Sequence, residues 1–217
     1  MFHLDPPPNF QPFDSRGEMT LYQRHLPHWR QQGATYFVTF RLADSLPQEK
    51  VRELQAMQQE AKNASEERKE ELSRTQMIKI EKWLDSGFGE CLLKNPDNLQ
   101  IVHEALRSLH GTDYELGAMA IMPNHVHALI RPSETRTLEE ILKSRKQWTS
   151  RRINRRAETS GALWQAESYD RIVRDGEHLW KVLQYIGRNP AKAGIKEVET
   201  MRWVSPTWQE CGWGFVD

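Results

Sequence analysis

The stretch YELGAMAIMPNHVHALIRP, residues 114–132, predicts two adjacent strands of one sheet. Its halves, 114–123 and 125–132, are apolar runs of strand length, and the turn-forming pair Pro123-Asn124 lies at their junction. Because so short a link can join only antiparallel neighbours, we expect a hairpin here.

The second of these strands carries two histidines on one face. Side chains alternate along a strand, so His125 and His127 project to the same side, about 7 Å apart along the backbone, while Val126 faces the core. Two imidazoles at this spacing can bind a single ion. A lone histidine is more often a hydrogen-bonded, half-buried residue, and for this pair the two interpretations stay equally open. A further ligand has to come from elsewhere in the chain.

Strand and helix patterns alternate through the rest of the chain. Setting residues 46–90 aside, the order is strand, helix, strand, strand, helix, strand, helix, which predicts an α+β fold: a ferredoxin-like antiparallel sheet (β-α-β-β-α-β) followed by a C-terminal helix. The last helix is expected to stop at Pro190. Besides the hairpin, the pattern predicts strands at 35–42 and 168–175 and helices at 95–111, 137–156 and 177–190.

Residues 46–90 are predicted to form a helical insertion. They are rich in Glu, Lys, Gln, Ala and Leu, but their apolar positions are sparse, as in one or two exposed helices outside the main core. The Pro-rich residues 1–33 are expected to be an extended arm. The sequence therefore predicts one domain at 34–208, interrupted by the insertion, and a tail at 209–217.

Charge is balanced over the whole chain but not along it. The 217 residues carry 30 basic and 30 acidic side chains, which would normally argue against a nucleic-acid partner. Residues 136–195, however, hold 13 Lys or Arg against 7 Asp or Glu, whereas residues 49–94 hold 9 against 10. A phosphate backbone would therefore lie on the C-terminal half.

Several protein classes are disfavoured by what the sequence lacks. No run of about 18 apolar residues is present, so we expect no membrane span. The first residues do not follow the basic-then-apolar order of a signal peptide, and we expect a cytoplasmic protein. Cys91 and Cys211 are too few and too isolated for a disulfide framework or a thiolate metal site.

The predicted C-terminal helix offers a further candidate ligand. Tyr185 and Asn189 are four residues apart and therefore lie on one side of that helix, on the partly exposed flank of its apolar stripe. Turned toward the histidines, they would add a phenol and an amide oxygen to two imidazoles. Taken singly, each has a simpler interpretation: a boundary tyrosine, and a helix-end residue before Pro190.

Longer motifs point to a known family. The four motifs are HLPHWRQQGATYFVTFRLADSLP (25–47), AIMPNHVHALIRP (120–132), SRKQWTSRRINR (144–155) and LWQAESYDRIVRDGEHLWKVLQYIGRNPAKAGI (163–195). On these motifs, from about residue 20 to 208, the chain resembles the REP-associated tyrosine transposases, within the single-stranded-DNA transposases named for a His-hydrophobic-His motif. The resemblance says little about the helical stretch 48–90.

The resemblance implies a reaction and the residues that carry it. Tyr185 would be the nucleophile, and His125, His127 and Asn189 would bind a divalent metal, Mg²⁺ or Mn²⁺; many relatives have Gln in place of Asn189. The enzyme would nick and rejoin single-stranded DNA near REP-like hairpins, through a 5′-phosphotyrosine and a free 3′-hydroxyl. A nitrogen and oxygen ligand set suits either ion, and covalent catalysis divides one hard displacement into two.

The helix predicted at 137–156, which a capping box of Thr137 with Glu140 is expected to begin, is the expected DNA-binding element. Phosphate neutralisation and base stacking are what a single strand requires of a protein. The alternative is a solvated helix face. His178, seven residues before Tyr185, is expected to have a structural or substrate-contact role. The basic and aromatic residues in question are Lys143, Arg145, Lys146, Trp148, Arg151, Arg152, Arg155 and Arg156.

Two rival functions stay open. A hairpin-DNA-binding protein could keep an intact site that it does not use, and a cleavage assay would separate it from an enzyme. A metal-dependent hydrolase could use water in place of Tyr185 and would form no covalent adduct. A histidine-triad nucleotide hydrolase is set aside, because Leu129 stands where its third alternating histidine would be. The expected partner is hairpin DNA, bound by a monomer or homodimer.

Overall fold

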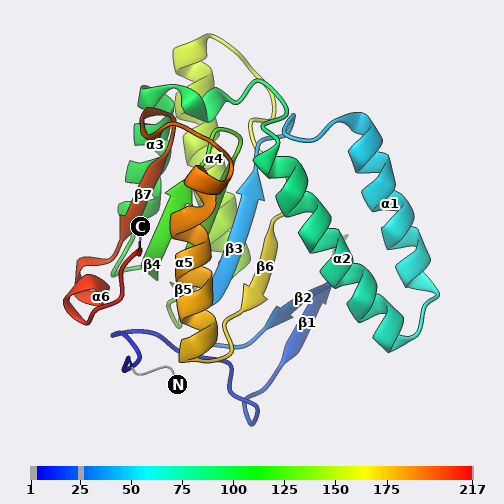
Figure 1. The fold of residues 1–217 in the computed structure, drawn as a ribbon, viewed down its shortest axis with the longest axis vertical. Coiled ribbons are helices and arrows are strands. Elements are labelled where there is room, and N and C mark those ends of the chain that lie inside the picture. The colour runs from blue at the N-terminus through cyan, green and yellow to red at the C-terminus, as the bar shows by residue number, and fades with distance from the viewer. Residues whose placement is uncertain (1–3, 24–26, 217) are drawn as a thin grey trace.

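A five-stranded antiparallel sheet forms the centre of the protein (Figure 1). The computed structural model describes residues 4–23 and 27–216. The strand order is β6-β3-β5-β4-β7, and every neighbouring pair runs antiparallel. The strands are β3 (Tyr36–Arg41), β4 (Tyr114–Ile121), β5 (His125–Pro132), β6 (Tyr169–Ile172) and β7 (Met201–Val204).

The predicted ferredoxin-like arrangement is confirmed by the first four of these strands. In chain order β3, β4, β5 and β6 stand at positions two, four, three and one across the sheet, and helices connect β3 to β4 and β5 to β6. The edge strand β7 was not predicted. It has four residues, MRWV, which pair with β4 but are too few to show an alternating pattern.

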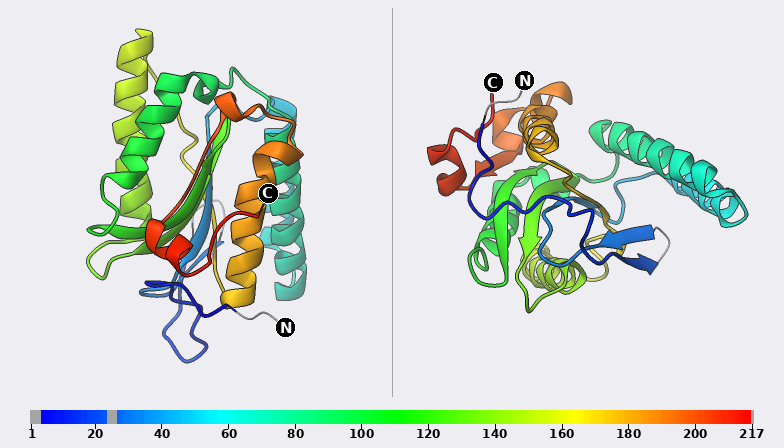
Figure 2. Two further views of the ribbon diagram at one scale, coloured as in Figure 1. Left: turned by 60° about the vertical axis from the view of Figure 1, so that its left-hand side comes forward. Right: turned by 90° about the horizontal axis from the view of Figure 1, so that it is seen from below.

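Helices cover both faces of the sheet (Figure 2). α3 (Pro96–Arg107) and α4 (Leu138–Ala157) lie on one face, and the predicted capping box of Thr137 with Glu140 begins α4. α5 (Gly176–Lys192) lies on the other, followed by the short α6 (Pro206–Glu210). The core on the α3–α4 side takes alternate strand residues together with both helices, among them Val38, Val126, Ala128, Leu106 and Ile141.

The packing of α5 brings its last turns close to the strands. Ala118 and Ala120 of β4 face this helix and belong to the same buried cluster as Leu183 and Ile186. Their small side chains let the α5 backbone approach the sheet. The helix was expected to stop at Pro190, but it continues to Lys192. A proline in the final turn removes one hydrogen bond, and here the helix ends within two residues of it.

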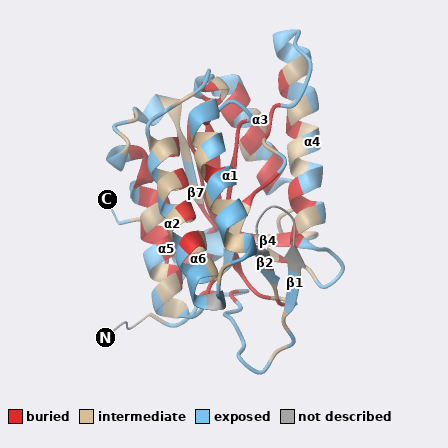
Figure 3. Ribbon diagram, turned by 90° about the vertical axis from the view of Figure 1, so that its right-hand side faces the viewer, coloured by how far each residue is buried: buried red, intermediate tan, exposed pale blue. Residues whose placement is uncertain are grey.

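The insertion forms two antiparallel helices beside β6, α1 (Gln48–Lys62) and α2 (Glu66–Asp85) (Figure 1). As predicted, much of their surface is exposed (Figure 3). Their few apolar positions gather in a small cluster with Leu46 and Tyr169. Two short 3-10 helices, η1 (Leu92–Lys94) and η2 (Glu197–Glu199), complete the connections.

The two ends of the chain are more structured than the predicted arm and tail. Within 1–33, β1 (Thr20–Gln23) and β2 (Pro27–Arg30) form a separate antiparallel pair. Trp213, in the predicted tail, is fully buried and donates its indole N–H to the Asp5 carbonyl at 2.8 Å. Such long-range contacts leave no periodic pattern in sequence. Within the described ranges, no helix combines the length and apolar composition needed to cross a membrane.

Candidate active site

The two histidines lie at the centre of the sheet, on the face covered by α5. His127 pairs with Thr39 of β3 on one side and Ala120 of β4 on the other. The alternation predicted from sequence therefore holds, and both imidazoles point to the same side. His125 and His127 are 1% and 0% exposed, so every polar atom of each ring needs a partner.

Hydrogen bonds determine which nitrogen of His125 carries the proton. The Asn124 side-chain nitrogen donates to the carbonyls of Leu84, at 3.3 Å, and Phe88, at 3.1 Å, so its Oδ1 is left to accept. That Oδ1 lies 2.7 Å from His125 Nδ1, which is therefore the protonated nitrogen. The Nε2 lone pair of His125 points into the site.

His127 is oriented in the same way from the neighbouring strand. Its Nδ1 lies 2.8 Å from Thr39 Oγ1, and its Nε2 lies 3.0 Å from His125 Nε2. Burial lowers the pKa of His125 to about 3, and burial together with the neighbouring His125 lowers the pKa of His127 well below its usual value. Both rings are therefore neutral at pH 7, the state that metal ligation requires.

The separation of the two Nε2 atoms suits a shared cation. Two nitrogens each ~2.1 Å from one ion, at a right angle, stand about 3 Å apart. Asn189 reaches the same point from α5, with its Nδ2 2.7 Å from His127 Nε2. Its Oδ1 is buried and makes no hydrogen bond to a described residue. Amide nitrogen and oxygen can exchange places, so the unpaired oxygen can turn toward the imidazoles.

Tyr185 stands one helical turn before Asn189 and packs on the same histidine. Its ring lies 5.4 Å from that of His127 and 5.8 Å from that of Phe37. The hydroxyl oxygen is buried, and no partner in the described part of the chain meets hydrogen-bond geometry with it. Burial raises the pKa of Tyr185 strongly, and the charges of Glu81 and Asp85 add to this, although the Asn189 side chain acts on the hydroxyl and lowers its pKa. The phenol is therefore fully protonated in this state.

The structure corrects one expectation about this helix. Tyr185 is half-buried, as predicted, but Asn189 is 1% exposed and lies in the core instead of on the flank. The difference arises because α5 sits close over the small alanines of β4, which brings its last turns down onto the sheet. His178 has a structural position, since its Nδ1 accepts the Arg174 backbone N–H at 3.1 Å near the start of α5.

Two cations beside the site were not predicted. The Arg171 guanidinium of β6 lies over the Phe37 ring, 5.0 Å from its centre, and Lys192 Nζ lies 6.0 Å from the centre of the Tyr185 ring. In the register of β3 and β6, Phe37 is opposite Arg171. The only sequence signal for Arg171 was its place in a strand; knowing the strand order would have placed it near the histidines.

The predicted DNA-binding helix lies on the opposite face of the sheet (Figure 2). Three of its candidate residues contact other parts of the chain. Arg145 donates to the Ala105 carbonyl, Lys146 to Ser168 Oγ, and Arg156 pairs with Asp97 at the surface. Among the others, Lys143, Arg151, Arg152 and Arg155 are exposed, and Arg152 lies over the half-buried ring of Trp148.

Comparison with known proteins finds relatives among transposases. Residues 92–189 match the family model described as "Transposase IS200 like", a segment that contains both histidines, Tyr185 and Asn189. The resemblance to the tyrosine transposases is confirmed. The "Putative REP-associated tyrosine transposase" of Haemophilus influenzae is 28% identical over 98 residues, covering 39% of this chain and 54% of that protein. The match thus spans about half the length of the Haemophilus influenzae protein.

A solved structure of a REP-associated tyrosine transposase, bound to a REP hairpin, also matches. The sequences are 16% identical, and the match covers 82% of this chain and 77% of that one, with a TM-score of 0.42.

Proposed function

We propose that this protein nicks and rejoins single-stranded DNA, with Tyr185 as the nucleophile. One observation carries the proposal: the Tyr185 hydroxyl and the Asn189 amide oxygen are both buried without a hydrogen-bond partner among the described residues. Buried polar groups are nearly always paired, so two unpaired oxygens beside two neutral imidazoles are typical of a site that awaits a ligand.

A divalent ion fits the donor atoms gathered here. His125 and His127 would hold it through their Nε2 atoms, and Asn189 through its unpaired amide oxygen. Imidazole nitrogen with amide oxygen suits Mn²⁺, and Mg²⁺ is the other candidate. When bound, such an ion supplies Lewis acidity and a template for the scissile phosphate.

The chain's own residues would carry the covalent steps. The Tyr185 oxygen gives up its proton and attacks the phosphorus, the bond from phosphorus to the 3′ oxygen breaks, and the departing 3′ oxygen takes up a proton, so the step has no net gain or loss of protons. A 5′-phosphotyrosine remains on the protein. Because this ester keeps the energy of the phosphodiester, a 3′-hydroxyl can attack it, release Tyr185 and rejoin the strand without a nucleotide cofactor.

Hairpin DNA is the proposed substrate. The relative from Haemophilus influenzae is described as REP-associated, and we extend that association to this chain. The exposed cations of α4 and the stacking surface of Trp148 with Arg152 support a nucleic-acid partner. A cytoplasmic protein acting as monomer or homodimer stays our expectation.

The proposal is tested by incubating the protein with Mn²⁺ and single-stranded hairpin DNA from the flanks of its own gene. Wild type should give a protein–DNA band that survives a denaturing gel. Tyr185→Phe keeps the ring and removes the attacking oxygen, so it should give no such band while hairpin binding persists. A stable band in Tyr185→Phe would refute Tyr185 as the nucleophile.

The burial of the site also favours a second candidate, a hairpin-binding protein that does not cleave. His125, His127 and Asn189 are at most 1% exposed, so a phosphate has no direct path to them. Hairpin binding by wild type with no covalent product and no nick would support this function instead.

A further inference from the structure

The cations beside Tyr185 lie on the accessible rim of the site. Arg171 and Lys192 are both exposed. Lys192 Nζ lies 6.0 Å from the centre of the Tyr185 ring, and Arg171 lies over the ring of Phe37, which in turn stacks on His127 at 5.5 Å. Positive groups this close to the proposed nucleophile are suited to hold a phosphate, which guanidinium and ammonium donors bind through charge-assisted hydrogen bonds.

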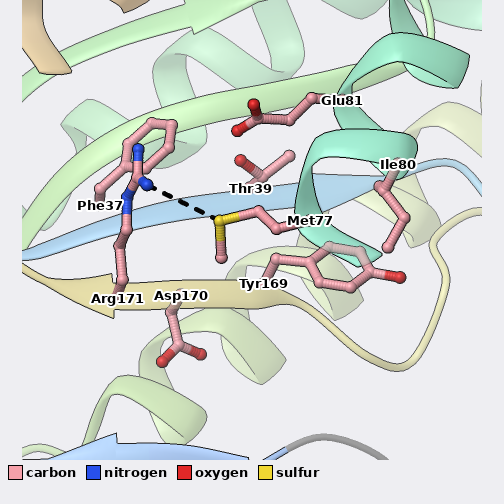
Figure 4. A pocket seen from close by; sticks show the side chains of 8 residues that line it. All are labelled: Phe37, Thr39, Met77, Ile80, Glu81, Tyr169, Asp170 and Arg171. Carbon is pink, nitrogen blue, oxygen red and sulfur yellow. Dashed lines mark hydrogen bonds between the residues drawn. The ribbon is translucent and has the colours of Figure 1, made fainter. Parts of the chain in front are cut away.

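The inserted helix α2 presents carboxylates to these cations. Asp85 pairs with Lys192 at 2.9 Å. Glu81 lines the same small pocket as Arg171, with its carboxylate pointing across β3 (Figure 4). Because the two acidic residues are four apart, they share one side of α2. The charges of both act on Tyr185. Carboxylates of α2 therefore face the cations and the nucleophile together.

We propose that Arg171 and Lys192 bind the phosphate that Tyr185 attacks. Until DNA displaces them, Glu81 and Asp85 occupy the place of that phosphate beside the two cations. This inference rests on the function proposed above. A carboxylate and a phosphodiester both present two oxygens sharing a negative charge, so one can replace the other at the same donors. The acidic gate, Glu81 and Asp85 of α2, keeps the site closed in the absence of substrate.

The contacts of α2 suit a gate that opens. The Asp85–Lys192 pair is open to solvent on its lysine side, where the side chain is 62% exposed, and covered on its aspartate side, where it is 14% exposed, so a polyanion can reach the lysine and compete for it. The end of α2 is also joined to the metal site, because Asn124 donates to the Leu84 carbonyl and accepts from His125. Movement of α2 would therefore reach the His125 ring directly.

The gate is tested by the double variant Glu81→Gln/Asp85→Asn, which removes both charges and keeps the side-chain shapes. Affinity for fluorescent single-stranded hairpin DNA should rise roughly two- to fivefold for each carboxylate, the scale of an exposed ion pair. Adduct formation should accelerate as well. The matched control is Glu67→Gln/Glu70→Gln, which removes the same net charge from exposed positions earlier in α2. Equal gains in the two double variants would overturn the gate.

The phosphate contacts are tested separately. Arg171→Gln and Lys192→Gln should each weaken DNA binding and slow adduct formation, while Mn²⁺ affinity stays at or above the wild-type value. In a protein that carries Lys192→Gln, the further change Asp85→Asn should have no effect on DNA affinity, because Asp85 is proposed to act by pairing with Lys192. Additive effects would overturn the pairing. Anisotropy needs no cleavage, so a wild type that binds DNA without forming an adduct would refute the proposed reaction and still test the gate.

Discussion

Thr39 decides which nitrogen of His127 faces the site. Its hydroxyl lies 2.8 Å from Nδ1 on the adjacent strand, which leaves Nε2 directed at His125 and Asn189. Partners of this kind orient a metal-binding histidine and are typically worth 10- to 100-fold in metal affinity. Neither of the two residues that orient the imidazoles, Thr39 and Asn124, belongs to the His-hydrophobic-His pair itself.

We therefore expect Thr39→Val to weaken Mn²⁺ binding by roughly 10- to 100-fold, and His127→Ala to remove it. Valine keeps the shape of threonine but cannot pair with Nδ1. Calorimetric titration with Mn²⁺ measures both effects. Thr35→Val is the control, since that hydroxyl accepts from the Gln11 backbone and not from a histidine. Wild-type affinity in both test variants would return the histidines to a purely structural role.

Among the elements, the β1–β2 pair is held to the sheet by buried charges. His28 lies 2.7 Å from Asp170 and 3.0 Å from Glu167, and Arg30 also pairs with Asp170 of β6. Burial lowers the pKa of His28, but its hydrogen bonds to the two carboxylates outweigh this and raise the pKa from 6.5 to about 9. The imidazolium is therefore the form that stabilises the fold.

This network predicts a loss of stability at alkaline pH. A group whose pKa is raised by folding contributes fully below its unfolded pKa, here 6.5, and loses that contribution as pH rises through about 9. The free energy of unfolding, measured with urea, should fall by up to about 3 kcal/mol between these limits. His28→Gln should be less stable at pH 6.5 and should show a flatter profile. Parallel profiles for the two proteins would contradict the assignment.

The elements that could be predicted are those with a repeating pattern. β5 matches its expected bounds at both ends, and α4 begins at the expected capping box, because periodicity and capping are local. The histidine pair could be placed for the same reason. The strands β1, β2 and β7 have only four residues each, which is too short to show an alternation of apolar and polar residues. The position of α2 over the site depends on partners such as Lys192, 107 residues away from Asp85.

At the scale of the whole molecule, the site and the predicted DNA-binding helix lie on opposite faces of the sheet (Figure 2). A strand bound on α4 would have to pass around the sheet to reach Tyr185. The path of the DNA therefore depends on whether α4 contacts phosphates. The dependence of DNA affinity on salt concentration tests this. Each phosphate contact contributes about 0.7 to the slope of log K against log salt for a single strand.

We expect the triple variant Arg151→Gln/Arg152→Gln/Arg155→Gln to flatten this slope by up to about 2 units. Arg156 is left in place, because it pairs with Asp97. Adduct yield at saturating DNA should stay near wild type. Anisotropy over a salt series measures the slope, and neutralising the exposed Arg16, Arg52 and Arg74 gives a control of equal charge. Equal slopes in the two triple variants would show that α4 faces solvent and that the DNA lies elsewhere.

The most direct test of the account is to locate the DNA on the protein. Wild type is incubated with Mn²⁺ and hairpin DNA, the adduct is digested with nuclease and trypsin, and the modified peptide is sequenced by mass spectrometry. We predict a nucleotide joined through phosphate to Tyr185 in the peptide VLQYIGR, residues 182–188. A nucleotide on the peptide that ends at Arg171, which contains Tyr169, would contradict the central claim, as would hairpin cleavage with no modified peptide.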